Sequence, residues 1–281
     1  MIPSLPPSTG PIGVFDSGYG GLTILDKIRG LMPEYDYIYL GDSARCPYGP
    51  RSFEVVYEFT LQAVSKLFEL GCPLVILACN TASAKALRTI QQINLPVIDA
   101  TRRVLGVIRP TAECIGEITR SRHVGILATA GTIKSESYLL EIHKLSPDIV
   151  VTGEACPMWV SLVENNEYQS EGADYFVKQH INRLLDKDPM IDTIILGCTH
   201  YPLLLDKIRQ FTPGHIRIIA QGEYVARSLQ DYLNRHPEMD ARCEKGGKCR
   251  FLTTESENKF EESASIFLGR QDIKVESIAL E

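Results

Sequence analysis

The chain has 281 residues, a net charge of −6 and an isoelectric point of about 5.6. This length suits two domains, each with its own hydrophobic core. The acidic balance argues against a nucleic-acid-binding surface, which needs clustered Lys and Arg. The most apolar stretches, within residues 73–79 and 191–196, are too short to span a bilayer. We therefore expect a soluble protein that contacts neither nucleic acid nor membrane.

The N-terminus and the cysteines indicate the cellular compartment. Residues 1–9 contain prolines but no basic segment followed by an apolar one, so we expect a loose leader and not a secretory signal. The eight cysteines are irregularly spaced, unlike those of a disulfide framework. Reduced thiols and a cytoplasmic location follow as expectations.

The first predicted strand, residues 12–16, ends in Asp16 and Ser17 and leads into a glycine-rich turn at residues 18–21. An amphipathic helix begins at Leu22 directly after this turn. Glycines permit close approach of the backbone, and a helix N-terminus can hold an anion. Asp16 and Ser17 could cap this helix, bind a substrate, or do both.

Ser52 predicts the start of the next long helix, and Gly71 follows its end. A buried strand then leads to Cys79, which is followed by Asn80 and Thr81. A lone cysteine at the end of a strand is usually a small buried hydrophobe. Polar residues directly after it favour a functional role instead.

The second half repeats this design. A strand at residues 124–128 leads to Thr129, and a strand at residues 194–197 leads to Cys198, Thr199 and His200. Together with Cys46-Pro47 and Cys156-Pro157, three anchors recur in the same order about 110 to 120 positions apart. We therefore expect a duplicated pair of α/β halves. Ligands bind outside the carboxyl ends of parallel strands, so both thiols should lie at functional edges.

The predicted fold is α/β, with two pseudo-symmetric doubly wound domains, mainly parallel sheets and an active site between them. Residues 10–100 and 214–281 form the first domain in this prediction, and residues 101–213 form the second. A strand at residues 216–220, a helix at residues 223–233 and an apolar segment at residues 251–252 are expected to complete the first half. The segment from Cys243 to Cys249 is expected to be an exposed loop, and its two thiols are too few for a usual zinc site.

Two opposed thiols suggest proton transfer at a carbon acid. A cysteine has a reference pKa of roughly 8.5, low enough for its surroundings to populate the thiolate near neutral pH. One cysteine would remove a Cα proton while the other donates a proton to the opposite face. His200 is expected to assist Cys198 in acid/base chemistry. A role as a metal ligand is disfavoured, because no His-Glu-rich motif lies near it in the sequence.

Four motifs together resemble the bacterial glutamate racemase family, over about residues 12–202. They are Asp16-Ser17-Gly18 with Gly20-Gly21, Cys46-Pro47-Tyr48-Gly49, Cys79-Asn80-Thr81-Ala82 and Gly197-Cys198-Thr199-His200-Tyr201-Pro202. The resemblance implies a racemase that interconverts L- and D-glutamate for peptidoglycan synthesis without a cofactor or metal. It also implies a homodimer.

The resemblance also assigns roles. The residue at Cys79 would remove the proton from D-glutamate and that at Cys198 from L-glutamate, with Asp16 assisting the first thiol and His200 and Glu164 the second. The implied substrate-binding residues are Asp16, Ser17, Pro47, Tyr48, Gly49, Asn80, Thr81, Thr129, Thr132, Thr199 and His200. Neutral donors and helix N-termini suffice to hold carboxylates, although Thr129 and Thr132 could equally have a structural role such as capping.

The chain departs from the family pattern at Gln221-Gly222, where an acidic or small polar pair is usual, and in the glycine-rich loop of residues 244–248. We expect neither departure to touch the core chemistry.

Other functions remain open at this point. A racemase of another acid, such as aspartate, would use the same thiols. A non-catalytic module that binds an acidic metabolite would need the binding residues but not two thiols. A pyridoxal enzyme needs a Schiff-base lysine, but Lys85 follows Asn80 within a predicted helix and is expected to lie on the surface.

Overall fold

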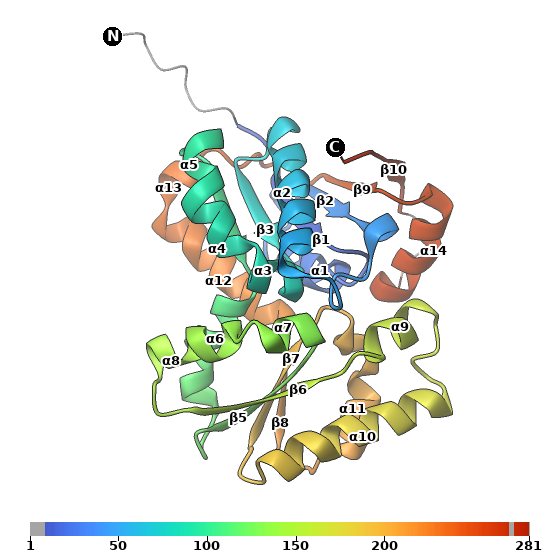
Figure 1. The fold of residues 1–281 in the computed structure, drawn as a ribbon. Helices are drawn as coiled ribbons and strands as arrows, with labels where there is room; N and C mark the ends of the chain where they lie inside the picture. The colour runs from blue at the N-terminus through green and yellow to red at the C-terminus, as the bar shows by residue number, and fades with distance from the viewer. Residues whose placement is uncertain (1–8, 270–272, 281) are drawn as a thin grey trace.

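The computed structural model describes residues 9–269 and 273–280, and they form two α/β units, one above the other in Figure 1. The expected leader, residues 1–9, lies outside the described residues except for the exposed Thr9. Each unit is built on one parallel sheet. The two-unit α/β architecture is the one predicted from the sequence.

The first unit contains a six-stranded sheet of order β10-β9-β2-β1-β3-β4. Its N-terminal part consists of β1 (Ile12–Asp16), α1 (Leu22–Leu31), β2 (Tyr37–Gly41), η1 (Ser43–Arg45), α2 (Phe53–Glu69), β3 (Leu74–Leu77), α3 (Asn80–Lys85), α4 (Leu87–Thr89), the π-helix η2 (Ile90–Asn94), α5 (Leu95–Ile98) and β4 (Arg103–Gly106). Its C-terminal part consists of α12 (Gly222–Arg235), α13 (Pro237–Asp240), β9 (Cys249–Thr253), α14 (Glu257–Leu268) and β10 (Val275–Ser277).

The second unit contains a four-stranded sheet of order β6-β5-β7-β8. Its elements are α6 (Ile108–Ile118), β5 (His123–Ala128), α7 (Ala130–Lys134), α8 (Ser137–Leu145), β6 (Val150–Ala155), α9 (Trp159–Glu164), α10 (Glu171–Lys187), β7 (Thr193–Gly197), η3 (Tyr201–Leu204), α11 (Leu205–Phe211) and β8 (Arg217–Ala220). The order β6-β5-β7-β8 repeats β2-β1-β3-β4. The internal repeat predicted from three anchors is therefore present in the topology.

Local sequence explains why these elements form. The Ser52 hydroxyl accepts a hydrogen bond from the Val55 amide and caps α2, as its position predicted. Gly71 follows this helix with a φ of 93°, a conformation that side-chain-bearing residues avoid. Successive residues of β1 point to opposite faces: Ile12 and Val14 join the cluster containing α1 and α12, and Phe15 joins that of α2. Each sheet is thus covered by helices on both faces.

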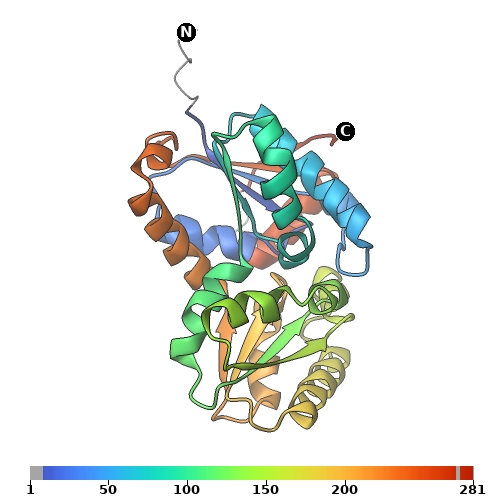
Figure 2. The ribbon, with the colours of Figure 1, turned by 60° about the vertical axis from the view of Figure 1, so that its left-hand side comes forward.

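One expected placement is wrong. The strand at residues 216–220 does not return to the first unit, because β8 pairs in parallel with β7 at the edge of the second sheet. Similarly, β4 pairs with β3 in the first sheet, beyond the boundary expected at residue 100. The chain therefore changes units directly after β4 and directly after β8, a few residues later than expected. In Figures 1 and 2, α12 accordingly packs on the first unit although β8 belongs to the second.

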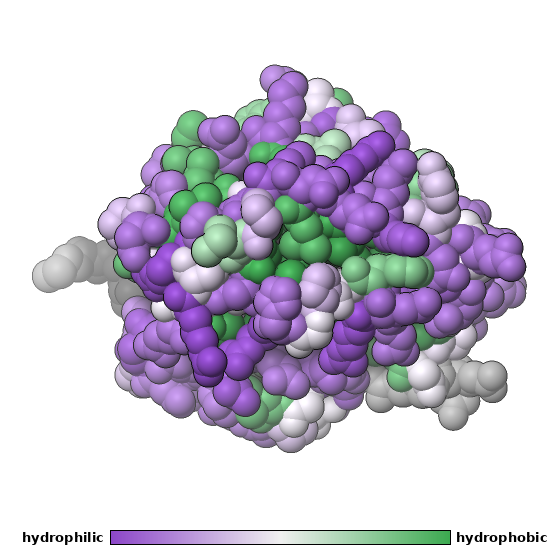
Figure 3. All heavy atoms as spheres, turned by 90° about the horizontal axis from the view of Figure 1, so that it is seen from below, coloured by the Kyte–Doolittle hydropathy of each residue, from purple (hydrophilic) through white to green (hydrophobic). Residues whose placement is uncertain are grey.

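Other expectations are confirmed. The helix near residues 223–233 and the apolar segment at 251–252 do belong to the first unit, as α12 and β9. Residues 244–248 are exposed, as expected of the loop between Cys243 and Cys249. Figure 3 views the end of the second unit, where hydrophobic atoms form a small area within a mostly hydrophilic surface. Among the described residues, no helix is both long and apolar enough to cross a membrane.

Candidate active site

The candidate site lies where the carboxyl ends of the two sheets face each other. In each sheet, the strand order reverses between two central strands, β1 and β3 in the first unit and β5 and β7 in the second. Such a switch point opens a crevice at the carboxyl ends of its strands. Cys79 and Ser17 lie at the first switch point, and Cys198 and Thr129 lie at the second. Both thiols are almost fully buried, as expected for groups enclosed between the units.

Cys79 lies at the N-terminus of α3, and its surroundings keep it protonated. Its Sγ atom lies 3.4 Å from Ser17 Oγ and accepts a weak contact from the Ala82 amide at 3.5 Å. Burial raises the pKa of the Cys79 thiol to about 12, and the negative charge of Asp16 acts in the same direction. A negative charge on the Cys198 sulfur adds to this shift.

Asp16 is fully buried at the end of β1 and links the two units. One carboxylate oxygen accepts a hydrogen bond from the Gly18 amide at 3.0 Å, and the other accepts one from the Thr199 hydroxyl at 3.3 Å. Burial raises the pKa of Asp16, whereas the nearby charge of His200 lowers it in part. No side-chain hydrogen bond caps α1, so the capping role considered for Asp16 and Ser17 is not found; the Asp16 carboxylate holds the turn at Gly18 instead.

Cys198 is paired with a buried imidazole. His200 Nδ1 lies 3.9 Å from Cys198 Sγ, and His200 Nε2 lies 2.9 Å from Glu164 Oε1 on α9. Burial by itself lowers the pKa of His200, but the contacts with Cys198 and Glu164 outweigh this and raise it to about 10. Burial likewise opposes ionisation of Glu164, yet His200 holds its pKa below the usual value. The imidazolium can therefore donate to a thiolate on one side and to a carboxylate on the other.

A third thiol, that of Cys46 in the first unit, contacts Glu164. Cys46 Sγ donates to Glu164 Oε1 at 3.0 Å, in a pair 118 positions apart in the chain. Burial and the Glu164 charge raise the pKa of Cys46 well above its usual value, so the thiol is the hydrogen-bond donor. The sequence placed Cys46 in a repeat anchor and in a family motif but assigned it no role, since no local pattern reports a partner so distant.

Three hydroxyls meet across the boundary between the units. Thr81 Oγ1 lies 2.9 Å from Thr129 Oγ1 and 3.3 Å from Thr132 Oγ1. Thr129 also caps α7 through the Thr132 amide, so the structural role considered for these threonines is real, with Thr129 as the cap. Hydroxyls both donate and accept, and this cluster can therefore turn donors toward a carboxylate.

The segment from Cys46 to Gly49 lies against both units. The Tyr48 ring is buried, and its hydroxyl donates to Asp42 Oδ2 within the first unit. The backbone of Gly49 does lie at the site: its carbonyl accepts from the Gly131 amide, and a Cβ at Gly49 would meet Thr129 at 2.9 Å. Pro47 follows a cis peptide bond that shapes this segment.

Gln221, where the chain departs from the family pattern, lies next to a predicted site residue. Its side-chain oxygen accepts a hydrogen bond from the Asn80 amide at 2.8 Å, next to Cys79. Tyr138, which no sequence motif singled out, donates to the Asn80 side-chain oxygen at 2.7 Å. Asn80 is therefore held by residues from both units.

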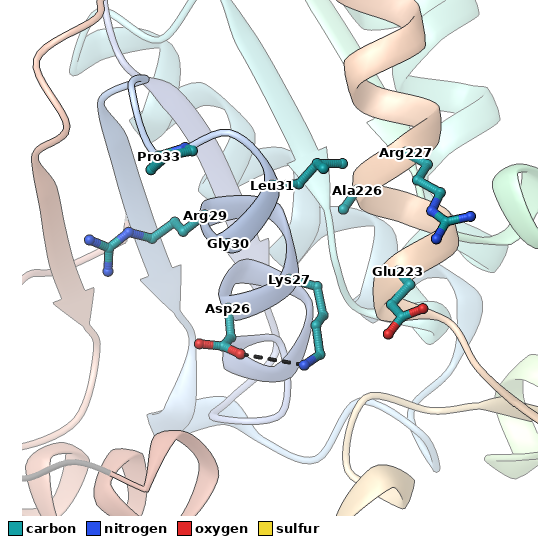
Figure 4. A pocket seen from close by; sticks show the side chains of 9 residues that line it. All are labelled: Asp26, Lys27, Arg29, Gly30, Leu31, Pro33, Glu223, Ala226 and Arg227. Carbon is teal, nitrogen blue, oxygen red and sulfur yellow. Dashed lines mark ion pairs between the residues drawn. The ribbon is translucent and has the colours of Figure 1, made fainter.

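The described residues contain no group of three or more Cys, His, Asp or Glu side chains suited to a metal ion. A separate hollow of about 540 Å³ lies between α1 and α12 (Figure 4). Its charged lining consists of Asp26, Lys27, Arg29, Glu223 and Arg227. Neither Cys79 nor Cys198 lines this hollow.

Comparison with known proteins accounts for this geometry. A sequence model of the Asp/Glu/Hydantoin racemase family matches residues 23–229, well over half of the chain. This chain belongs to that racemase family. It is 38% identical over 270 residues to the glutamate racemase of Ruegeria sp. strain TM1040, covering 92% of this chain and 97% of the relative. The Bacillus cereus glutamate racemase is 39% identical, with 96% and 97% coverage.

Solved structures of racemases agree with the fold. Glutamate racemase isoform RacE1 from Bacillus anthracis superposes with a TM-score of 0.87 at 36% identity, covering 96% of this chain and 98% of that one. The Francisella tularensis glutamate racemase, solved in complex with D-glutamate, gives a TM-score of 0.85 at 31% identity, with 99% of both chains covered. The chain is thus a racemase, and the resemblance noted in its motifs is confirmed.

Proposed function

We propose that this racemase interconverts L- and D-glutamate by a two-base mechanism in which Cys79 and Cys198 act on opposite faces of Cα. The observation that carries the proposal is the pair of buried thiols, one at each switch point, in surroundings of opposite character. Cys79 is beside a carboxylate and Cys198 is beside an imidazolium. The first thiol is thereby kept protonated, and the second lies beside a positive charge that can stabilise a thiolate.

In the direction from L to D, the Cys198 thiolate removes the Cα proton and becomes a thiol. The electron pair left on Cα is delocalised into the substrate carboxylate. The Cys79 thiol then donates its proton to the other face of Cα and becomes a thiolate. One proton leaves the substrate and one arrives, so the product is the mirror image and the two cysteines have exchanged protonation states.

The reverse direction begins from the exchanged state. The Cys79 thiolate removes the proton from D-glutamate, and the Cys198 thiol, assisted by His200 and Glu164, supplies the new one. Ser17 Oγ and the Ala82 amide lie next to Cys79 Sγ and can stabilise its thiolate. Asp16 is placed to assist the proton transfer of this first thiol.

Substrate binding is proposed for the neutral donors around the thiols. They are Ser17, Gly49, Asn80, Thr81, Thr129, Thr132 and Thr199, with Asp16 and His200 close by and with Pro47 and Tyr48 acting through the shape of their segment. Such donors hold carboxylates without a cation, and helix N-termini add to the attraction. Glutamate is proposed as the substrate because the relatives are glutamate racemases and one was solved with D-glutamate.

We propose that no step needs a metal or an organic cofactor, since two thiols and a histidine provide the proton transfers. The ammonium group of Lys85, the lysine considered above for a pyridoxal Schiff base, donates a hydrogen bond to the Arg51 carbonyl. The resemblance further supports supply of D-glutamate to peptidoglycan, a cytoplasmic location and a homodimer. The two sheets, with their helices, are proposed as the two domains.

The test measures optical rotation with metal-free and pyridoxal-free protein, using L-glutamate and L-aspartate in parallel. Loss of rotation with L-glutamate, and much slower loss with L-aspartate, is the expected result. Faster turnover of L-aspartate would reassign the substrate. Binding of glutamate by folded protein without any change of rotation would replace catalysis by a binding function.

A further inference from the structure

Gln221 occupies an unusual position in the molecule. It directly follows β8, where the chain leaves the second sheet, and it precedes α12, which packs against α1 of the first unit. Val107 occupies the equivalent position after β4, where the chain leaves the first sheet. The Gln221 side chain donates to the Val107 carbonyl at 3.1 Å and so joins the two crossings between the units.

The same amide has three further partners. Its Nε2 also lies 2.7 Å from the Tyr138 hydroxyl and 3.1 Å from Thr111 Oγ1, so its two hydrogens are shared among three acceptors. Its Oε1 accepts from Asn80 Nδ2 at 2.8 Å. Gln221 is 3% exposed, and its side-chain partners are buried as well. Buried amides with every polar atom bonded are fixed in orientation, because each lost bond would leave a desolvated group.

Asn80, Gln221 and Tyr138 form a closed ring of hydrogen bonds. Tyr138 donates to Asn80 Oδ1, Asn80 Nδ2 donates to Gln221 Oε1, and Gln221 Nε2 donates to Tyr138. This direction of donation fixes which end of the Asn80 amide carries oxygen. One hydrogen of Nδ2 is used by the ring, which leaves the other for a substrate carboxylate.

We propose that Gln221 is a positioning residue for the racemase reaction: through the ring with Tyr138 it fixes the amide of Asn80 beside Cys79, and through Val107 it fixes the crossing between the two units. This inference rests on the proposed function, since it takes Asn80 as a ligand of glutamate. The consequence is a contribution to substrate affinity from a residue that never touches substrate.

The experiment compares Gln221→Leu and Tyr138→Phe, each of which keeps most of the side-chain volume, with Gln91→Leu as the matched control. Gln91 lies exposed on η2, and its amide donates to the Val104 carbonyl of β4 at 2.7 Å. Each variant is characterised by KM and kcat for both enantiomers, by the Kd of D-glutamate from calorimetry, and by its unfolding midpoint.

Both ring variants should raise KM and Kd on the order of tenfold, the effect of losing one buried hydrogen bond, while kcat changes less. The double variant should raise them no further, because both changes act through Asn80. Gln91→Leu should lower the unfolding midpoint without raising KM. Because Tyr138→Phe retains its ring in the core, it remains informative if Gln221→Leu fails to fold.

Unchanged KM and Kd in the ring variants would overturn the inference and leave the proposed function intact. Effects that multiply in the double variant would also overturn it, since they would show independent actions. A wild-type chain that binds D-glutamate without racemising it would reject the proposed function, and the Kd values would then decide the inference alone. A wild-type chain that neither binds nor racemises glutamate would overturn both.

Discussion

The two thiols of the site have been made chemically unequal by their neighbours. Cys79 faces the carboxylate of Asp16 within a buried environment, whereas Cys198 faces His200, whose pKa of about 10 keeps it cationic at neutral pH. The resting protein therefore favours a thiol at Cys79 and a cationic imidazole beside Cys198. In the proposed mechanism this inequality lets the two cysteines take the opposite roles of acid and base.

Replacing either rim cysteine tests whether both act on the substrate. Cys79→Ala and Cys198→Ala should each lower kcat/KM by about two to four orders of magnitude, the usual contribution of a positioned acid or base. Cys72→Ala is the control, because Cys72 is also fully buried and burial raises its thiol pKa to about 12. It packs in the apolar cluster of the first unit and should retain wild-type turnover. Wild-type activity in either rim variant would exclude the two-base scheme.

The raised pKa of His200 makes stability depend on pH. Its pKa rises from the ordinary 6.5 to about 10 in the folded state, so the stabilisation is fully present below pH 6.5 and is lost as pH rises toward 10. The free energy of unfolding of the wild type should thus fall over this window more steeply than that of His200→Asn. His143→Asn, which removes an exposed imidazole whose Nε2 lies 2.8 Å from the Ile149 carbonyl, serves as control. Denaturant titrations at several pH values give these slopes, and parallel slopes for wild type and His200→Asn would contradict the assignment.

At the level of elements, the turn between β1 and α1 needs a glycine at position 20 for the two units to meet. A Cβ atom at Gly20 would lie 2.3 Å from Thr199 Oγ1 and 2.5 Å from His200 Nδ1. The sequence predicted a close approach of backbone at this turn but not its partner. That partner proves to be the second unit itself.

Gly20→Ala should therefore displace the residues beside Cys198, abolish most activity and lower the free energy of unfolding by about 1–3 kcal/mol, as overpacking does. Gly30→Ala is the matched control, because Gly30 lies in α1 and a Cβ there would meet nothing within 4 Å. Alanine favours helix, so the free energy of unfolding of this control should rise by about 0.5 kcal/mol, and its activity should stay unchanged. Kinetics and denaturant unfolding of both variants provide the measurement. A fully active Gly20→Ala would show that this approach is not required.

Prediction from sequence succeeded for elements whose signals are local. The helix cap at Ser52, the glycine after α2 and the strands leading to Cys79 and Cys198 all follow from residues adjacent in the chain. The placement of β8 failed because an apolar edge strand does not encode which of two similar sheets it joins. The Cys46–Glu164 contact and the ring at Gln221 were equally out of reach, since each joins segments more than 50 residues apart.

For the whole molecule, the site belongs to neither unit alone. Asp16 bonds to Thr199, Thr81 lies against Thr129, and Asn80 is held by Tyr138, so buried polar contacts join the units around the thiols. The repeat of strand order gives each unit a switch point at the carboxyl ends of its strands. Substrate held between them should therefore stabilise both units together.

Calorimetric unfolding with increasing D-glutamate tests this coupling. At a concentration of about 100 times Kd, the ligand should add roughly 2.7 kcal/mol to the free energy of unfolding. The whole unfolding transition should move to higher temperature, because both units contribute to the site. A separate transition that ligand leaves in place would show that one unit does not take part in binding.

The position of solvent hydrogen in the product tests the central claim most directly. Wild-type protein is incubated with L-glutamate in deuterated water, and the enantiomers are separated early in the reaction and analysed by mass spectrometry. Two opposed thiols predict that D-glutamate carries deuterium at Cα while the remaining L-glutamate still carries protium. D-glutamate that retains protium, or L-glutamate that gains deuterium before D-glutamate forms, would contradict a mechanism in which Cys198 removes the proton and Cys79 replaces it.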